Sequence, residues 1–249
     1  MSTAFRLLLT AFSLLMLVLV WQVAAWWLAS PLLPGPPAVM KAMEQAAAQG
    51  ALQTNIAITL ARVAVSFALA MVVGSAVGIM LGRSRQLNEL FGPWLIVLLN
   101  LPALVIIILC YVWFGLTEVA AITAVAINKI PNVAVTMREG AAALSRDLDE
   151  MARVYRIPAF KALRDVTLPQ LVPFFTASAR SGLALTWKIV LVVELLGRSN
   201  GVGFALQTAF QLFDVATVLA YALAFTVVVQ FIEIALLQPW ERWANRWRR

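Results

Sequence analysis

Long apolar runs separated by short polar segments fill most of the chain. An α-helix needs about 20 apolar residues to cross a bilayer. Six runs have about that length or more, at residues 7–28, 55–81, 90–114, 119–137, 172–196 and 215–237. The pattern therefore predicts an all-α polytopic membrane protein with six transmembrane helices.

The polar segments between the runs divide the chain further. We expect a first transmembrane helix in residues 1–30, a loop and surface helix in 31–54, a core of five transmembrane helices in 55–240 that includes a long polar loop at 138–170, and a basic tail at 241–249. Residues 197–214 are amphipathic, which predicts a second surface helix inside the core region.

The first apolar run has two interpretations. Arg6 followed by an apolar stretch is also the pattern of a secretory signal peptide. The run is longer than the roughly 7–15 residues of a signal-peptide core. Trp26 and Trp27 close it, as aromatic residues do at a membrane interface. The sequence favours an anchored transmembrane helix over a cleaved leader.

Small residues and a proline mark the second and third runs. Gly74 and Gly78 lie in a stretch of small residues in the second run, and small residues let membrane helices approach closely. Pro102 interrupts the third run. A proline inside a span kinks the helix and frees backbone groups, so we expect a broken helix there.

Composition supports a membrane protein and excludes several enzyme classes. The chain is 62% hydrophobic and 12% charged, against about 45–50% and about 25% in soluble domains. It has no histidine, and its single Cys110 lies in an apolar run. Disulfide frameworks, His-based metal sites and His-activated nucleophiles are therefore excluded. No constellation for a membrane-embedded enzyme remains.

The placement of basic residues predicts the topology. The net charge is +7, and most Lys and Arg residues lie in four segments: around Arg6, in the 82–88 loop, in 138–170 and in the tail. The loops predicted on the opposite side of the membrane hold only Lys41 and Arg198. Clusters between apolar runs are a topology signal and argue against a nucleic-acid partner. Both termini and 138–170 are expected in the cytoplasm, and 31–54 in the periplasm.

The 138–170 loop is the longest polar segment of the chain. Loops this long between helices are usually functional. Asp147 and Asp149 are candidate N-caps for a helix that begins near Glu150. Pro158 would end this helix before a second helical stretch. The pattern predicts a helix–turn–helix presented to the cytoplasm.

This loop carries a recognisable motif. Glu150-Met151-Ala152, followed by Val166-Thr167-Leu168-Pro169, resembles the EAA motif of ABC importer permeases. That motif reads Glu-Ala-Ala, three residues, Gly, nine residues, then Ile-x-Leu-Pro. Arg156 stands at the Gly position, so the usual tight turn is altered there or is supplied by Pro158.

The resemblance extends from about residue 31 to residue 240. The chain is similar to permeases of the nitrate, sulfonate and taurine importer group. The matching stretches are Thr59-Leu60-Ala61-Arg62-Val63, Gly78-Ile79-Met80-Leu81-Gly82, Trp113-Phe114-Gly115-Leu116, Glu194-Leu195-Leu196 and Gly201-Val202-Gly203. The resemblance implies the type I (MetI-like) permease fold and a place in the bacterial inner membrane, surrounded by lipid.

The resemblance also implies partners. Two permease copies would pair, two ATP-binding cassette subunits would receive their cytoplasmic helices, and a periplasmic or lipid-anchored binding protein would deliver the solute. The residues implied in ATPase coupling are Glu150, Met151, Ala152, Arg153, Tyr155, Arg156, Ile157, Pro158, Phe160, Leu168 and Pro169. Glu150 would pair with a basic residue, small Ala152 would permit close approach, and the apolar side chains would fill a pocket. The basic side chains of this set could equally serve to orient the chain in the membrane or to bind anionic lipid.

The energy source must be another chain. No Gly-x-x-x-x-Gly-Lys-[Ser/Thr] phosphate loop occurs in the sequence. We therefore expect this subunit to have no ATPase activity and no cofactor or metal of its own. ATP and Mg²⁺ would be bound by the partner ATPase.

Ionisable residues inside the spans suggest a solute path. Lys129 and Lys188 lie deepest by position, and two cations would suit an anionic solute such as a sulfonate, nitrate or carboxylate. The candidate path residues are Asn100, Pro102, Asn128, Lys129, Trp187 and Lys188. The alternative for the lysines is pairing with Glu118 or Glu194, or snorkelling to the interface. Arg62 and Arg180 lie nearer the span ends, where structural pairing or snorkelling is expected instead.

Two transporter classes fit these observations. An ATP-driven importer explains the ordered cytoplasmic loop, which a secondary transporter working alone does not need. Recovery of an ATPase with the chain from native membranes separates the two.

Overall fold

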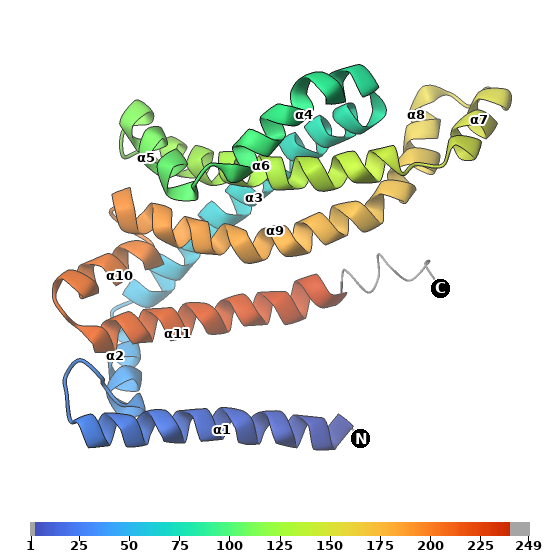
Figure 1. The fold of residues 1–249 in the computed structure, drawn as a ribbon. Coiled ribbons are helices and arrows are strands. Elements are labelled where there is room, and N and C mark those ends of the chain that lie inside the picture. Colours follow the sequence, from blue (N-terminus) through green and yellow to red (C-terminus); the bar gives the residue numbers. More distant parts are fainter. Residues whose placement is uncertain (1–2, 240–249) are drawn as a thin grey trace.

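The computed structural model describes residues 3–239, and every regular element in that range is helical (Figure 1). The helices are α1 (Thr3–Leu28), α2 (Pro36–Ala48), α3 (Ala51–Arg83), α4 (Arg85–Asn100), α5 (Ala103–Phe114), α6 (Glu118–Ala142), α7 (Arg146–Val154), α8 (Ala159–Ala162), α9 (Leu168–Gly197), α10 (Val202–Gln211) and α11 (Val215–Ile232). π-Helical turns, Leu163–Thr167 and Glu233–Leu237, precede α9 and follow α11.

The helix lengths agree with the predicted fold class. Four helices, α1, α3, α6 and α11, are long and apolar enough to cross a membrane. Two bent pairs, α4 with α5 and α9 with α10, bring the number to six when each pair counts as one span. The predicted surface helix at 197–214 is therefore α10, which continues from α9 through a bend of 51°.

The predicted break at Pro102 is sharper than a kink. α4 and α5 meet at 96° because Leu101 and Pro102 both have extended backbone, with ψ of 130° and 129°. A proline disfavours helical geometry in the residue before it, so the interruption covers both positions. The third run consequently forms two helices.

Close contact between α3 and α6 organises the centre of the fold. A Cβ at Gly74 would lie 2.6 Å from the Cβ of Val133, and a Cβ at Gly78 would lie 2.7 Å from the Cβ of Met137. These distances leave no room for a side chain. The prediction that small residues allow close helix packing is confirmed at both positions.

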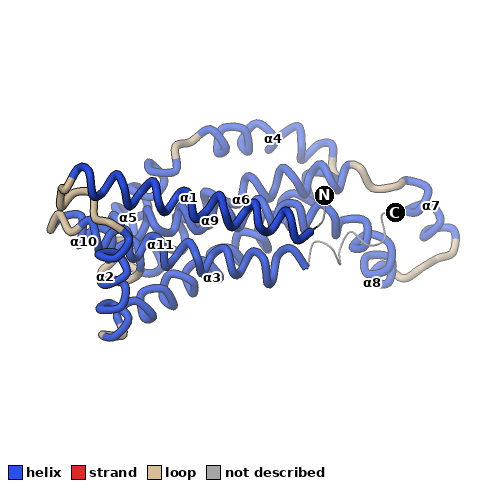
Figure 2. The backbone as a smooth tube through the Cα atoms, turned by 90° about the horizontal axis from the view of Figure 1, so that it is seen from below, coloured by secondary structure: helices blue, strands red, loops and turns tan. Residues whose placement is uncertain are grey.

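The bundle has two ends with different features. α7 and α8 lie at one end with the beginning of α1, and α2 and α10 lie at the opposite end; Figures 1 and 2 show this from two directions. We call these the loop end and the turn end. The turn end also holds the α5–α6 and α9–α10 turns, above a core cluster centred on Val125, Trp187 and Val190.

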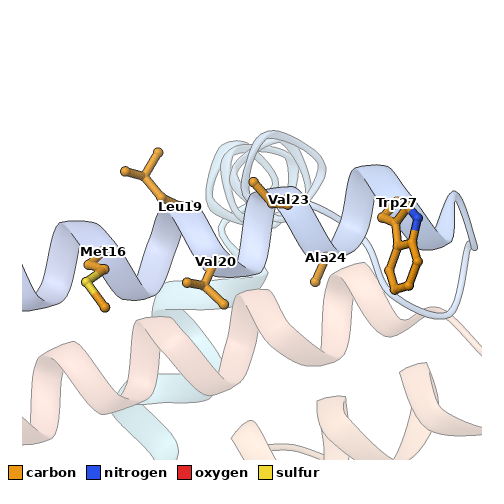
Figure 3. Close-up of a pocket in the computed structure, with 6 residues that line it drawn as sticks. All are labelled: Met16, Leu19, Val20, Val23, Ala24 and Trp27. Carbon is orange, nitrogen blue, oxygen red and sulfur yellow. The ribbon is translucent and has the colours of Figure 1, made fainter.

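Helix α1 stands apart from this core. Met16, Val20, Ala24 and Trp27 point from α1 toward α11 (Figure 3), and with Leu19 and Val23 they line an apolar hollow of about 420 Å³. Most of the α1 span is uncovered; its last turns contact the loop before α2, where the Trp21 indole donates to the Pro34 carbonyl. Such a surface is compatible with lipid or another apolar helix and offers nothing to bind a charged solute.

Candidate functional site

The loop between α6 and α9 is ordered as helix, turn, helix. α7 begins at Arg146, earlier than expected. The hydroxyl of Ser145 accepts a hydrogen bond from the backbone N–H of Leu148 at 3.5 Å, which is the arrangement of an N-cap. The prediction that Asp147 or Asp149 caps this helix is therefore wrong, since both lie inside it.

A left-handed residue ends α7. Arg156 has φ of +51°, and the N–H of Ile157 donates to the carbonyl of Ala152 at 2.9 Å. This is a Schellman ending, in which the left-handed position is usually glycine. The tight turn of the EAA motif is therefore kept, and it is made at Arg156 itself rather than at Pro158.

The turn predicts that Arg156→Gly stabilises the loop. Left-handed backbone costs a residue with a side chain about 1–2 kcal/mol, which exceeds the roughly 0.5–1 kcal/mol lost through the freedom of glycine. We expect slower amide hydrogen exchange across α7 in the purified variant. Arg153→Gly, at a helical position of α7, is the matched control and should exchange faster. Faster exchange in Arg156→Gly would show that the turn is not strained.

The coupling residues differ in where their side chains lie. Tyr155 and Phe160 are aromatic yet 76% and 77% exposed, and Val154, which was not among the predicted coupling residues, is 78% exposed beside them. Glu150 is exposed on α7, whereas Ala152 is buried and packs within the chain. Met151, Arg156, Pro158, Leu168 and Pro169 are exposed, Ile157 is half-buried, and the side chain of Arg153 lies outside the described part. The tail at 241–249 also lies outside it.

The lysines expected to line a path face different environments. Lys129 is 2% exposed and packs against α9, where a Cβ at Gly182 would lie 2.7 Å from its Cε atom. Trp187 is buried in the core, and Lys188 is exposed on α9. Lys188 alone among these three therefore reaches the surface of the chain.

The α4–α5 break also carries two of the expected path residues. Asn100 and Pro102 are both exposed. The Asn100 amide donates to the carbonyl of Ile96 at 2.7 Å, which satisfies a group at the end of α4. Their described contacts are those of a helix terminus.

Polar side chains nevertheless gather on the outward sides of α6 and α9, two helices that pack together. We call the following residues the polar face: Asn128, Asn132 and Thr136 on α6, and Arg180, Ser181 and Lys188 on α9. The α6 members are spaced by four residues and hydrogen-bond the carbonyl one turn earlier. Asn132, Thr136, Arg180 and Ser181 were not among the path residues expected from the sequence.

A second site lies at the turn end. The sequence indicated it only through the expected pairing or snorkelling of Arg62, without naming the partners. Arg62 is 5% exposed. Its guanidinium donates to Glu194 at 2.7 Å and, as a fork, to Glu118 at 2.9 and 2.5 Å. Arg198 donates to Glu118 at 2.7 Å. We call these four residues the charge network. The predicted alternative that Glu118 or Glu194 pairs with a lysine is therefore wrong.

The charge network also holds the α9–α10 turn. Three backbone N–H groups of the turn donate to side chains: Gly201 to Asn55 Oδ1, Val202 to Thr59 Oγ1 and Gly203 to Glu194 Oε2. In the opposite direction, Arg62 Nη1 donates to the backbone carbonyl of Asn200. All four distances are 2.9 Å. Asn55, Thr59 and Arg62 belong to α3. They are about one helical turn apart and therefore lie on one face of that helix. One face of α3 thus binds the whole turn.

The fold and motif agree with a family comparison. Residues 70–237, more than half of the chain, match the family of binding-protein-dependent transport system inner membrane components. The chain belongs to this family. The matched region includes the α7–α8 loop and most of the residues that form the polar face and charge network.

Relatives of this permease cover most of its length. It is 27% identical over 93% of the chain to a candidate aliphatic sulfonates transport permease (SsuC) of Bacillus subtilis strain 168, covering 84% of that protein. It is 27% identical over 88% of the chain to the taurine transport system permease TauC of Escherichia coli K12, again covering 84%. The words sulfonates and taurine in these names refer to the relatives and not to this chain.

A solved structure shows the same fold. The permease superposes on a chain of the MetNI methionine ABC transporter in an inward-facing conformation, with a TM-score of 0.64 and 18% identity. The match covers 77% of this chain and 97% of that chain. The predicted type I, MetI-like permease fold is confirmed.

Proposed function

We propose that this permease is the membrane subunit of an ATP-driven importer of small anionic solutes. The observation that carries the proposal is the α7–α8 loop, an ordered helix–turn–helix with apolar side chains exposed at its tip. An exposed apolar patch of this kind is typical of a protein interaction site. In a family of binding-protein-dependent transport components, the partner that moves such a loop is an ATPase.

The loop is suited to transmit force. Ser145 N–H donates to the side chain of Gln170 at 3.0 Å, which ties the start of α7 to α9. The α8 helix continues through a π-helical turn into α9 without a loop. A push on α7 or α8 therefore reaches a transmembrane helix directly. ATP and Mg²⁺ belong to the ATPase in this scheme, because this chain has no phosphate loop.

The orientation follows from the same loop. The beginning of α1 lies at the loop end (Figure 1). The basic 82–88 segment lies there too, because Gly82 packs against Ala141 at the end of α6, just before the basic α7–α8 loop. The positive-inside rule places the loop end in the cytoplasm of a bacterial inner membrane. The turn end would then face the periplasm and a solute-binding protein.

A second permease copy would cover the polar face. Uncovered amide and charged side chains within a span are costly against lipid, so this face requires protein or water beside it. Two copies meeting across it would enclose a polar path. Lys188 and Arg180 make that path cationic, which suits a sulfonate-like solute such as those named for the relatives.

Co-purification tests the assignment. We expect the tagged full-length permease to recover an ATP-binding cassette ATPase from native membranes solubilised in mild detergent, identified by mass spectrometry. The Glu150→Arg chain, expressed at the same level, is the matched control and should recover much less. If neither chain recovers an ATPase, the result contradicts the proposal and favours the secondary-transporter interpretation.

Lys188→Ala is expected to lower solute uptake. Lys188 is the exposed lysine of the polar face, and its removal weakens the attraction of the path for an anion. Radiolabelled uptake into cells, with the binding protein present, measures the effect. Lys41→Ala, an exposed lysine on α2, is the control and should leave uptake unchanged. Equal uptake by both variants would show that Lys188 does not contact the solute.

A further inference from the structure

We propose that the charge network is a permanent clamp. It holds the turn ends of α3, α6 and α9 and the start of α10 together as one unit throughout the transport cycle. Arg62 is the central positioning residue of this clamp. The proposal concerns how the chain moves and goes beyond its assignment as an importer subunit.

The energetics of buried charge favour a clamp that stays closed. Glu194 is fully buried and Arg62 nearly so, and both lie within apolar helices. Breaking a buried ion pair strands an uncompensated charge in a low-dielectric interior, which is strongly unfavourable. Because α3 and α9 contribute one partner each, separating them at this level would carry that cost. Side chains elsewhere in the contact are mostly apolar and impose no comparable barrier.

The packing around Glu194 allows no alternative arrangement. A Cβ at Gly201 would clash with the Glu194 carboxylate, and a Cβ at Gly203 would clash with the carbonyl of Leu191. Gly201 also has φ of +103°, a region that side chains rarely adopt. The turn is therefore built around the carboxylate, which also receives the Thr59 hydroxyl at 2.9 Å.

The network is graded from the core to the surface. The Glu118 side chain is 49% exposed, the Arg198 side chain 11% and the Arg62 side chain 5%. Glu118 is thus the accessible end of a buried assembly, and it can be changed without stranding Glu194. If the clamp holds, the turn end opens by movement of whole clamped units, such as two copies moving apart, and not by helices separating within one chain.

Short-range spin labelling tests the clamp. Cysteines replace Val119 and Ser199, exposed neighbours of the Glu118–Arg198 pair, in a Cys110→Ala background. The labelled full-length chain, diluted with unlabelled chain in nanodiscs, is measured by continuous-wave electron paramagnetic resonance. We expect strong dipolar broadening in the otherwise unchanged chain. We expect loss of that broadening in Glu118→Gln, whose fold is retained because Arg62 still binds Glu194.

Two further variants sharpen the test. Arg62→Lys keeps the charge but not the fork that binds two carboxylates, so it should also lose the broadening. Glu89→Gln removes the exposed Arg85–Glu89 pair of α4, which is not part of the charge network, and should keep the dipolar broadening. Unchanged broadening in Glu118→Gln and Arg62→Lys would overturn the clamp. These measurements need neither an ATPase nor a solute, so they stand if the importer assignment fails.

The permanence of the clamp is tested in the assembled transporter. The same label pair is measured with the co-purified ATPase, with and without ATP·Mg²⁺. Equal broadening in both states is expected. A nucleotide-dependent loss of broadening would show that the clamp opens during the cycle and would overturn the proposal.

Discussion

Glu150→Arg is expected to abolish ATP-driven uptake while leaving the permease in the membrane at normal levels. Glu150 is exposed on α7, and its side chain makes no ion pair or hydrogen bond with any side chain that the structure describes. Its carboxylate is therefore available to a basic residue on the ATPase. Reversing its charge places like charges together at the interface, which costs several kcal/mol, or about a hundredfold or more in affinity.

Two measurements separate coupling from folding in this experiment. Uptake is assayed in proteoliposomes that contain the purified transporter, and the amount of permease is read from the same membranes. Glu89→Arg, a charge reversal at an exposed position of α4, is the matched control and should transport normally. Normal transport by Glu150→Arg would remove Glu150 from the coupling interface and leave Val154, Tyr155 and Phe160 as the candidates for docking.

The helices and the loop were predictable because their signals are local. Hydropathy located α3, α6, α9 and α11 to within a few residues, since a bilayer imposes length and apolarity on each span independently. The loop motif likewise lies within twenty residues. Arg156 was the exception, because no local rule says that an arginine will adopt the left-handed conformation that a Schellman ending requires.

The charge network was not predictable in the same way. The sequence suggested lysines as partners of Glu118 and Glu194, because hydropathy shows that a buried charge needs a partner but not which one. Their actual partner, Arg62, lies 56 and 132 positions away in the chain. The one available signal was that the stretches around Thr59, Glu194 and Gly201 each resemble stretches of the importer permeases. The fold brings these three stretches together at the charge network.

The sequence could not give the orientation of the path residues, for a related reason. Position within a span estimates depth but not the direction of a side chain. Lys129 and Lys188 looked equivalent by depth, yet the first packs against Gly182 and the second faces outward. Helical spacing counted from Lys188 would have pointed to Ser181 of the polar face as well.

Gly78→Ala is expected to destabilise the permease strongly, although it adds only one methyl group. The added Cβ would clash with the Ala134 carbonyl and lie 2.7 Å from the Cβ of Met137. Backbone cannot move aside as a flexible side chain can, so α3 and α6 must separate along their contact. Overpacking of this kind costs about 1–3 kcal/mol or more, which outweighs the gain of about 1 kcal/mol from replacing a helical glycine with alanine.

Gly92→Ala is the matched control for that prediction. Gly92 is also buried and helical, but a Cβ there would lie 3.5 Å from the nearest described side-chain atom, Asn88 Oδ1. No backbone atom of another helix blocks this methyl group, but Pro93 follows it, and a proline disfavours helical geometry in a preceding residue with a Cβ. This variant should therefore change stability much less than Gly78→Ala does. Unfolding in mixed detergent micelles, followed by circular dichroism, compares the two. Equal stability would mean that α3 and α6 have more freedom at their contact than their spacing allows.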